Sequence, residues 1–175
     1  MRIPVFFPAA IAAVSALVAL TAVGAGGAGP DAATLLKTAA ILVDRTHYLE
    51  ALDLLEEAKD VLDRDGMNQT PLYGDVLYAL AEAKIKGRLH QSFSAYYVKS
   101  ALDDIQATNK IREKIGGILP QKLAQGYYLE GVIHKRFFMH KAKAMSCFVK
   151  AVNIDSSSAA AKRELSELIT GARWE

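Results

Sequence analysis

Three histidines stand at the start of the same short pattern, and imidazoles in register are a possible ligand set for metal or haem iron. In each copy a small residue follows four positions later, a bulky apolar residue after four more and a small residue three beyond that. The copies are His47-Ala51-Leu55-Ala58, His90-Ser94-Val98-Ala101 and His140-Ala144-Phe148-Ala151. Adjacent helical units pack about 10 Å apart, whereas zinc–nitrogen bonds are about 2 Å long. We therefore expect no metal and no cofactor, and we interpret the histidines as turn residues that mark a repeat.

Other catalytic chemistry has little support. The chain contains no glycine-rich phosphate loop, no Gly-x-Ser-x-Gly and no His-Glu-x-x-His, and the Cys-x-x-Cys-His motif of covalent haem attachment is absent. Cys147 is the single cysteine, which excludes an internal disulfide, and the neighbouring pair Ser146-Cys147 has no evident base. The sequence therefore predicts a protein that is not an enzyme and has no catalytic residues.

Charge separates the two ends of the chain but gives no footprint for nucleic acid. The 175 residues carry a net charge of +2, and without Arg2 and the rest of the first 30 residues, 20 basic groups face 19 acidic ones. Eight acids lie between Asp44 and Asp65, whereas residues 131–154 hold five basic residues and no acid. Head-to-tail self-association is one interpretation of this asymmetry, and ordinary solvated faces are the other.

Residues 1–30 form a nearly uncharged apolar segment. Arg2 is the one charge before Asp31, Ala9 to Val23 has about the length of a signal-peptide core, and small residues follow. The segment is either a cleaved signal peptide or an uncleaved anchor, because the run from Ile3 to Gly29 could also span a bilayer. Both alternatives predict that residues 31–175 are exported to the periplasm or the extracytoplasmic face of a membrane.

The remainder of the chain reads as helices joined by short turns. Apolar residues recur at helical spacing, and Gly87 and Gly116-Gly117 are stop signals. The start signals are Asp31, Thr70-Pro71, Pro120 and the turn Asp155-Ser156-Ser157-Ser158, which contains capping residues. The expected helices are 32–44, 48–62, 71–86, 92–115, 120–137, 141–152 and 159–170, and 171–175 is an open tail. Three antiparallel pairs result, and the last helix covers the open end of the third pair. A register of 50 residues matches Tyr78 with Tyr128 and His90 with His140, which favours a solenoid of repeated helix pairs over residues 31–170.

The small and bulky residues of these units carry a family resemblance. They are Ala51, Leu55 and Ala58 in the first unit, Tyr78, Ala81, Ser94, Val98 and Ala101 in the second, and Tyr128, Gly131, Ala144, Phe148 and Ala151 in the third. Over about residues 34–170 the chain resembles the tetratricopeptide repeat (TPR) family, although its units are spaced by 43 and then 50 residues. The resemblance implies an all-α, right-handed helical-hairpin solenoid with about three helix pairs and a C-terminal capping helix. A related helical-hairpin solenoid outside this family is the alternative.

The resemblance also implies a role in binding proteins, through a groove lined by the first helix of each pair. The residues expected to bind a partner are Leu129, Ile133, Arg136, Phe137 and Lys86. An apolar stripe bordered by Lys135 and Arg136 suits an amphipathic or acidic segment. The alternative is that Ile133 and Phe137 pack under the last helix or against the preceding pair, because apolar stripes on helices are usually core.

These observations predict an exported, TPR-like adaptor that mediates protein–protein interaction, in a bacterial envelope assembly or secretion complex. The alternative is a structural subunit of a membrane complex, anchored by an uncleaved N-terminal helix. The expected partners are proteins, with the membrane added if the N-terminal segment is retained.

Overall fold

The computed structural model describes residues 31–171, which lie almost wholly in the unit that begins at Ala32. Helices account for 79% of these residues, and no strand occurs among them, which confirms the all-α prediction. The elements are α2 (Ala32–Asp44), α3 (Tyr48–Arg64), α4 (Pro71–Leu89), α5 (Tyr96–Ile115), α6 (Pro120–Arg136), α7 (Lys141–Ile154) and α8 (Ala159–Thr170). The predicted signal peptide or anchor at 1–30 lies outside the described residues, as does most of the predicted tail.

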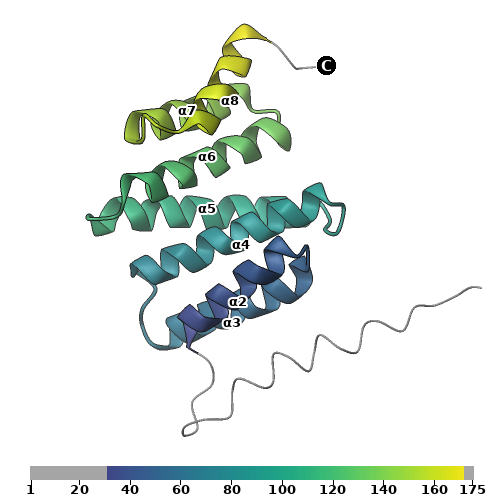
Figure 1. The fold of residues 1–175 in the computed structure, drawn as a ribbon, viewed down its shortest axis with the longest axis vertical. Helices are drawn as coiled ribbons and strands as arrows, with labels where there is room; N and C mark the ends of the chain where they lie inside the picture. Colours follow the sequence, from purple (N-terminus) through teal and green to yellow (C-terminus); the bar gives the residue numbers. More distant parts are fainter. Residues whose placement is uncertain (1–30, 172–175) are drawn as a thin grey trace, which may run out of the picture. The chain divides into compact units, whose positions relative to one another are not determined.

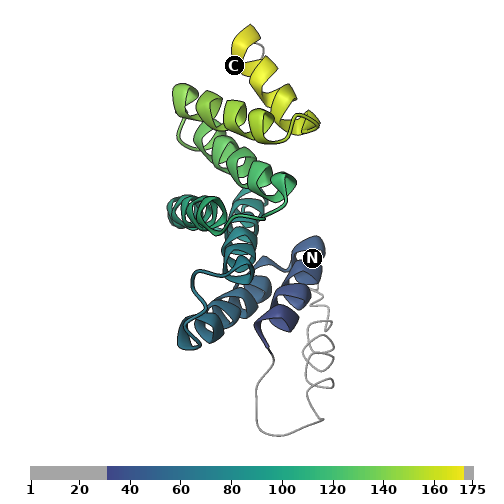
Figure 2. The ribbon, with the colours of Figure 1, turned by 90° about the vertical axis from the view of Figure 1, so that its left-hand side faces the viewer.

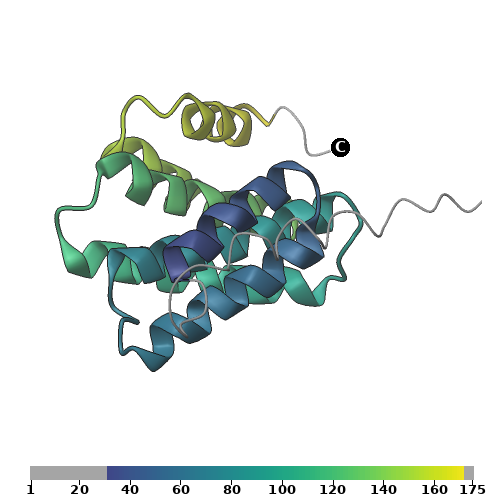
Figure 3. The same cartoon turned by 60° about the horizontal axis from the view of Figure 1, so that its bottom comes forward.

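The helices follow one another in chain order from α2 to α8 (Figure 1). The closest packing is within the pairs α2–α3, α4–α5 and α6–α7, and each pair also contacts the next element through α3–α4, α5–α6 and α7–α8. Helix α4 additionally contacts α2 and α6. Figure 2 shows α5 nearly end-on, and Figure 3 tips the end formed by α2 and α3 toward the viewer. The first helix of the second pair, α4, therefore contacts the first helices of both neighbouring pairs.

Most predicted helix bounds are confirmed, but the expected stop of the third helix at Lys86 is wrong. Helix α4 runs through Gly87 to Leu89, because Gly87 is buried and a Cβ atom at this position would overlap the ring of Phe93. The helix ends where Gln91 adopts a positive φ of 60° and the amide of Ser92 donates to the carbonyl of Gly87 at 2.8 Å. Gly87 is thus a packing residue inside the helix rather than its terminator.

The fourth helix starts at Tyr96 rather than at the predicted Ser92. The intervening segment carries Phe93, which is 4% exposed and stacks on Tyr97 with ring centroids 4.5 Å apart. Ser94 is therefore an exposed turn residue, and its predicted packing role is wrong. The other small and bulky residues of the three-copy pattern are buried, with exposed fractions between 0% and 4%.

Apolar clusters join neighbouring pairs along the unit. One cluster unites α2, α3 and α4, a second lies among α4, α5 and α6, and two smaller ones hold α6, α7 and α8 together. The last helix is also fastened by charge: the ammonium of Lys135 on α6 lies 2.6 Å from the carboxylate of Glu164, which is 2% exposed, and 2.9 Å from that of Glu167. Helix α8 thus covers the end of the third pair through both apolar and ionic contacts.

Candidate binding surfaces

The three histidines of the repeated pattern occupy turns or turn boundaries and are not brought together. His47 precedes α3 and its Nδ1 lies 3.3 Å from Glu50, while the ring of His90, after α4, lies 5.5 Å from Tyr48. His140 precedes α7 and contacts the ring of His134 at 5.7 Å. Within residues 31–171, no group of three or more His, Cys, Asp or Glu side chains is arranged to hold a metal ion.

Two of the residues predicted to bind a partner are part of the core. Leu129 is 8% exposed and Ile133 is 0% exposed, and both belong to the apolar cluster among α4, α5 and α6. Phe137, which follows the last residue of α6, is half-buried against the same cluster. The alternative interpretation, packing against the preceding pair, therefore describes this stripe, and a partner cannot reach Leu129 or Ile133 without opening the core.

The two predicted basic residues are accessible but lie beside acids of the same chain. Lys86 is paired with Glu82 at 3.1 Å on α4, and Arg136 lies 3.8 Å from the Glu164 carboxylate. Lys135, expected to border the stripe, is held by Glu164 and Glu167. Its pKa is raised, because hydrogen bonds to these two carboxylates outweigh the opposing effect of burial. The charge of Lys135 is therefore compensated by α8, whereas Arg136 stays about half exposed.

The face made by α4, α6 and the start of α8 carries a cavity of about 440 Å³, and we call it the α4–α6–α8 face. Its lining residues are Tyr78, Gln121, Ala124, Gln125, Tyr128, Asp155, Ser157, Ser158, Ala159 and Ala160. Burial raises the pKa of Tyr78 to about 12, so its hydroxyl stays neutral and can both donate and accept hydrogen bonds. The two glutamine amides are exposed on α6. The cavity therefore offers aromatic surface together with neutral hydrogen-bonding groups.

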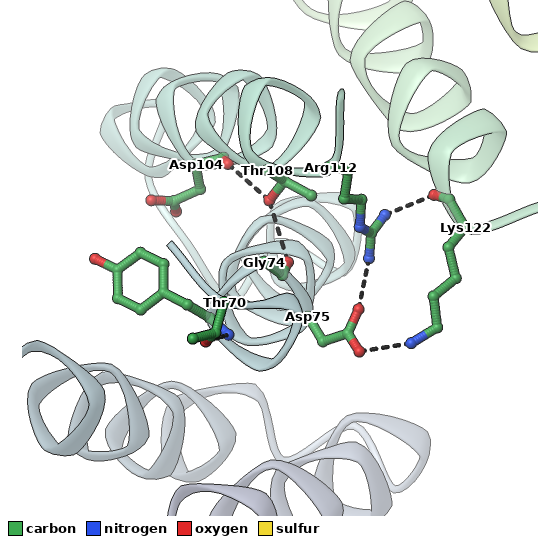
Figure 4. Close-up of polar contacts among 8 residues, drawn as sticks. Thr70, Gly74, Asp75, Asp104, Thr108, Arg112 and Lys122 are labelled. Carbon is green, nitrogen blue, oxygen red and sulfur yellow. Dashed lines mark hydrogen bonds and ion pairs between the residues drawn. The ribbon is translucent and has the colours of Figure 1, made fainter. Parts of the chain in front are cut away.

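A buried arginine sets the position of this cavity. Arg112 on α5 is 4% exposed; its Nη2 donates to Asp75 on α4 at 2.9 Å and its Nη1 to the carbonyl of Lys122 on α6 at 2.6 Å (Figure 4). The Lys122 ammonium donates to the carboxylate of Asp75 at 2.6 Å and completes this cluster. The guanidinium carbon also lies 5.0 Å from the ring centroid of Tyr78. The register of α6 on α4, and hence the placement of Tyr78 near Tyr128, depends on this cluster.

The sequence contained an indication of this face, but the residues predicted to bind a partner did not include it. Tyr78 and Tyr128 correspond in the 50-residue register, and both line the cavity. On α6 the accessible residues that line the cavity are Gln121, Gln125 and Tyr128. The predicted stripe, Leu129 and Ile133, starts at the residue directly after Tyr128. One position is 100° on a helix, which is enough to turn a side chain from the surface into the core.

The thiol of Cys147 is buried. Burial raises the pKa of the Cys147 thiol to about 12, so the thiolate that reacts or binds metal is not formed near neutral pH.

No protein-family model matches the chain, and no curated protein is similar to it. The helices between residues 31 and 171 include none with the length and apolar character that a membrane span requires.

Proposed function

We propose that the chain is an exported protein-binding adaptor whose helix pairs form a right-handed, TPR-like solenoid. The observation that carries the proposal is the cavity on the α4–α6–α8 face, where Tyr78, Gln125 and Tyr128 from two successive first helices meet. First helices that lie side by side present a continuous surface along which an extended segment can lie. The direct contacts of α4 with α2 and α6 support this arrangement.

The partner is best matched by an extended peptide segment with a small apolar or aromatic side chain. Glutamine amides and tyrosine hydroxyls can bond the backbone amides of such a segment without requiring a charge, and the tyrosine rings supply apolar contact area. The pairing of Lys135 with Glu164 and Glu167 weakens the reason to prefer an acidic segment. This refines the predicted partner from amphipathic or acidic to uncharged.

Site-specific photo-crosslinking tests the proposal. A benzophenone amino acid at Gln125 should give a discrete adduct in the native host, and the same group at Lys99, an exposed position on α5, should not. Substitution of Gln121 and Gln125 by lysine should abolish capture of that partner while helicity is retained, because both side chains are exposed. Equal adducts at both positions, or capture that survives the double substitution, would refute this binding face.

The apolar run from Ile3 to Gly29 supports a second candidate, a structural subunit anchored in a membrane complex. Mass spectrometry of the native N-terminus separates the two. A start between about Gly26 and Asp31 supports the released adaptor, and an intact Met1 or Arg2 supports the anchored subunit.

A further inference from the structure

A polar groove lies between α5 and α7, with α6 as its floor, and it plays no part in the proposed function. One cavity of about 260 Å³ is lined by Gln106, Tyr127, Glu130, His134, Lys143, Ser146, Cys147 and Lys150. A second cavity of about 350 Å³ shares Gln106, Tyr127, Glu130 and Lys150 with it and extends along α5 to Asn109, Lys110 and Glu113. We call the two cavities together the α5–α7 groove.

The floor of the groove holds an oriented carboxylate without a cationic partner. Glu130 accepts hydrogen bonds from the amide nitrogens of Gln106 at 3.1 Å and Asn109 at 2.9 Å. Both donors are neutral, and within residues 31–171 Glu130 forms no ion pair. Each carboxylate oxygen can accept two hydrogen bonds, so a ligand donor can still be bound. The two amides fix the direction in which this charge is presented.

A buried imidazole beside Glu130 lacks one hydrogen-bond partner. His134 is 4% exposed, lines the 260 Å³ cavity, and its Nδ1 is buried with no partner among the described residues. Burial lowers the pKa of His134, so the ring is neutral near pH 7 and each nitrogen can serve as a donor or an acceptor, depending on the tautomer. A buried polar atom without a partner is unfavourable, because it has lost its hydrogen bonds to water. Because His134 lines the cavity, a ligand or water held there could complete this atom.

The α7 wall contributes two ammonium groups. Lys143 and Lys150 are exposed residues seven positions apart, which places them about 10 Å apart along the helix, with Ser146 between them. Neither lysine forms an ion pair within the described range. The Lys150 ammonium lies 4.8 Å from the ring centroid of Tyr127. The 260 Å³ cavity therefore combines two cations with one anion.

We propose that this cavity binds a free acidic amino acid, L-glutamate or L-aspartate. Such a ligand carries two carboxylates and one ammonium group, the complement of Lys143, Lys150 and Glu130. The ammonium lies on the Glu130 carboxylate, the carboxylates are held by the two lysines, and Ser146 and His134 complete the hydrogen bonds. The cavity lies just below the range of about 300–1,000 Å³ occupied by drug-sized ligands, which suits a metabolite of this size.

Isothermal titration of the full chain with L-glutamate and L-aspartate tests the proposal. At least one should bind saturably and on the order of 10-fold more tightly than L-glutamine, which lacks the second carboxylate, or glutarate, which lacks the ammonium group. Glutarate that binds as tightly as glutamate would overturn the assignment to Glu130. The absence of saturable binding of both amino acids up to about 10 mM would overturn the whole site.

Substitutions locate the ligand. Lys143→Met and Lys150→Met should each weaken glutamate binding on the order of 10-fold, because each removes a charge-assisted contact. Lys141→Met removes the same charge from α7 outside the cavity lining and is the matched control. Glu130→Gln should lower the preference for glutamate over glutarate, and its circular dichroism and Tm show whether the fold is retained. Equal losses in K141M and K143M would show a general charge effect and contradict the site.

Discussion

The junction between the first and second helix pairs is built from apolar side chains, whereas the junction between the second and third pairs is half polar. At the first, α2 and α3 meet α4 through one cluster that includes Leu55, Leu62 and Leu80. At the second, Ile105 packs on Leu129 and Ile133 in the same apolar manner. That contact also has a polar half, in which Asn109 and Arg112 from α5 bond Glu130 and Lys122 of α6. The two junctions thus join similar helix pairs by different means.

Apolar contacts stabilise a junction, whereas buried polar contacts also specify how its helices are placed. Apolar contacts are non-directional and tolerate repacking when volume is conserved. A buried guanidinium requires particular partners in particular places, and it is costly when those partners are lost. The first junction contains one comparable group, Lys84 on α4, which is 5% exposed; it lies 3.5 Å from Glu56 on α3, across the junction, and 2.7 Å from Asp104 of its own pair. The second junction therefore fixes the register of α6, which the proposed binding face requires, at the cost of low tolerance to substitution.

Arg112→Ala is expected to have the largest effect and to distinguish the junctions most sharply. The substitution removes the side-chain donor of the Lys122 carbonyl and leaves Asp75 with Lys122 as its remaining ion-pair partner. We expect a loss of about 3–5 kcal/mol in the free energy of unfolding. Leu55→Met in the fully buried core of the first junction should cost less than about 1.5 kcal/mol. Urea denaturation measures both.

Arg163→Ala is the matched control, because this arginine is exposed on α8 and lies 3.9 Å from Glu164. It should change the free energy of unfolding by less than about 1 kcal/mol. A cost of Arg112→Ala that is no larger than that of Arg163→Ala would show that the second junction is held by its apolar half alone.

Two glycines inside helices are expected to respond in opposite directions. At Gly126 in α6 an added Cβ would overlap the Oδ1 of buried Asn109, so Gly126→Ala should displace the amide that bonds Glu130 and cost about 1–3 kcal/mol. At Gly74 in α4 the nearest atom would be 3.6 Å away, on Ile111, which is an ordinary contact. Gly74→Ala should therefore stabilise the protein by up to about 1 kcal/mol, through helix propensity.

Thermal denaturation of the two variants, compared with the unsubstituted chain, measures this contrast. Opposite shifts in Tm would show that the polar half of the second junction is closely packed around Asn109. A Gly126→Ala variant as stable as the unsubstituted chain would show instead that Asn109 can move aside without cost.

The sequence was sufficient to predict where the helices lie, but not which neighbouring side chains pack over them. Helix α8 has its predicted bounds, because Ser158 caps its start, where it accepts from the amide of Ala161, and Gly171 ends it in the left-handed conformation. The burial of Ile133 was ambiguous, because an apolar stripe does not identify the neighbour that covers it. The pairing of Lys135 with Glu164 joins residues 29 positions apart, a separation at which local periodicity carries no information. The polar contacts between α5 and α6 at the second junction could not be predicted for the same reason.

The smallest expected effect is a dependence of stability on pH that originates at His134. The described histidines next to turns, His47, His90 and His140, are exposed, whereas His134 lies within α6 and is buried. The pKa of His134 is lowered from 6.5 by burial and by the nearby Lys143 and His140, against an opposing effect of Glu130. As the pH falls below about 6.5, the unfolded chain therefore binds a proton before the folded chain does. Folding stability must decrease with falling pH until the lowered pKa is reached.

Urea denaturation between about pH 8 and about pH 5 should show this decrease in the unsubstituted chain. The decrease should be smaller in His134→Gln, which cannot titrate, and unchanged in His90→Gln, the exposed control. If His134→Gln retains the full dependence, the proton is taken up elsewhere, and the imidazole beside Glu130 is accessible enough to be protonated in the folded chain. That outcome would also remove the argument that a ligand could complete its Nδ1. A smaller dependence in H134Q alone would locate the titrating group on the floor of the α5–α7 groove, next to the polar junction.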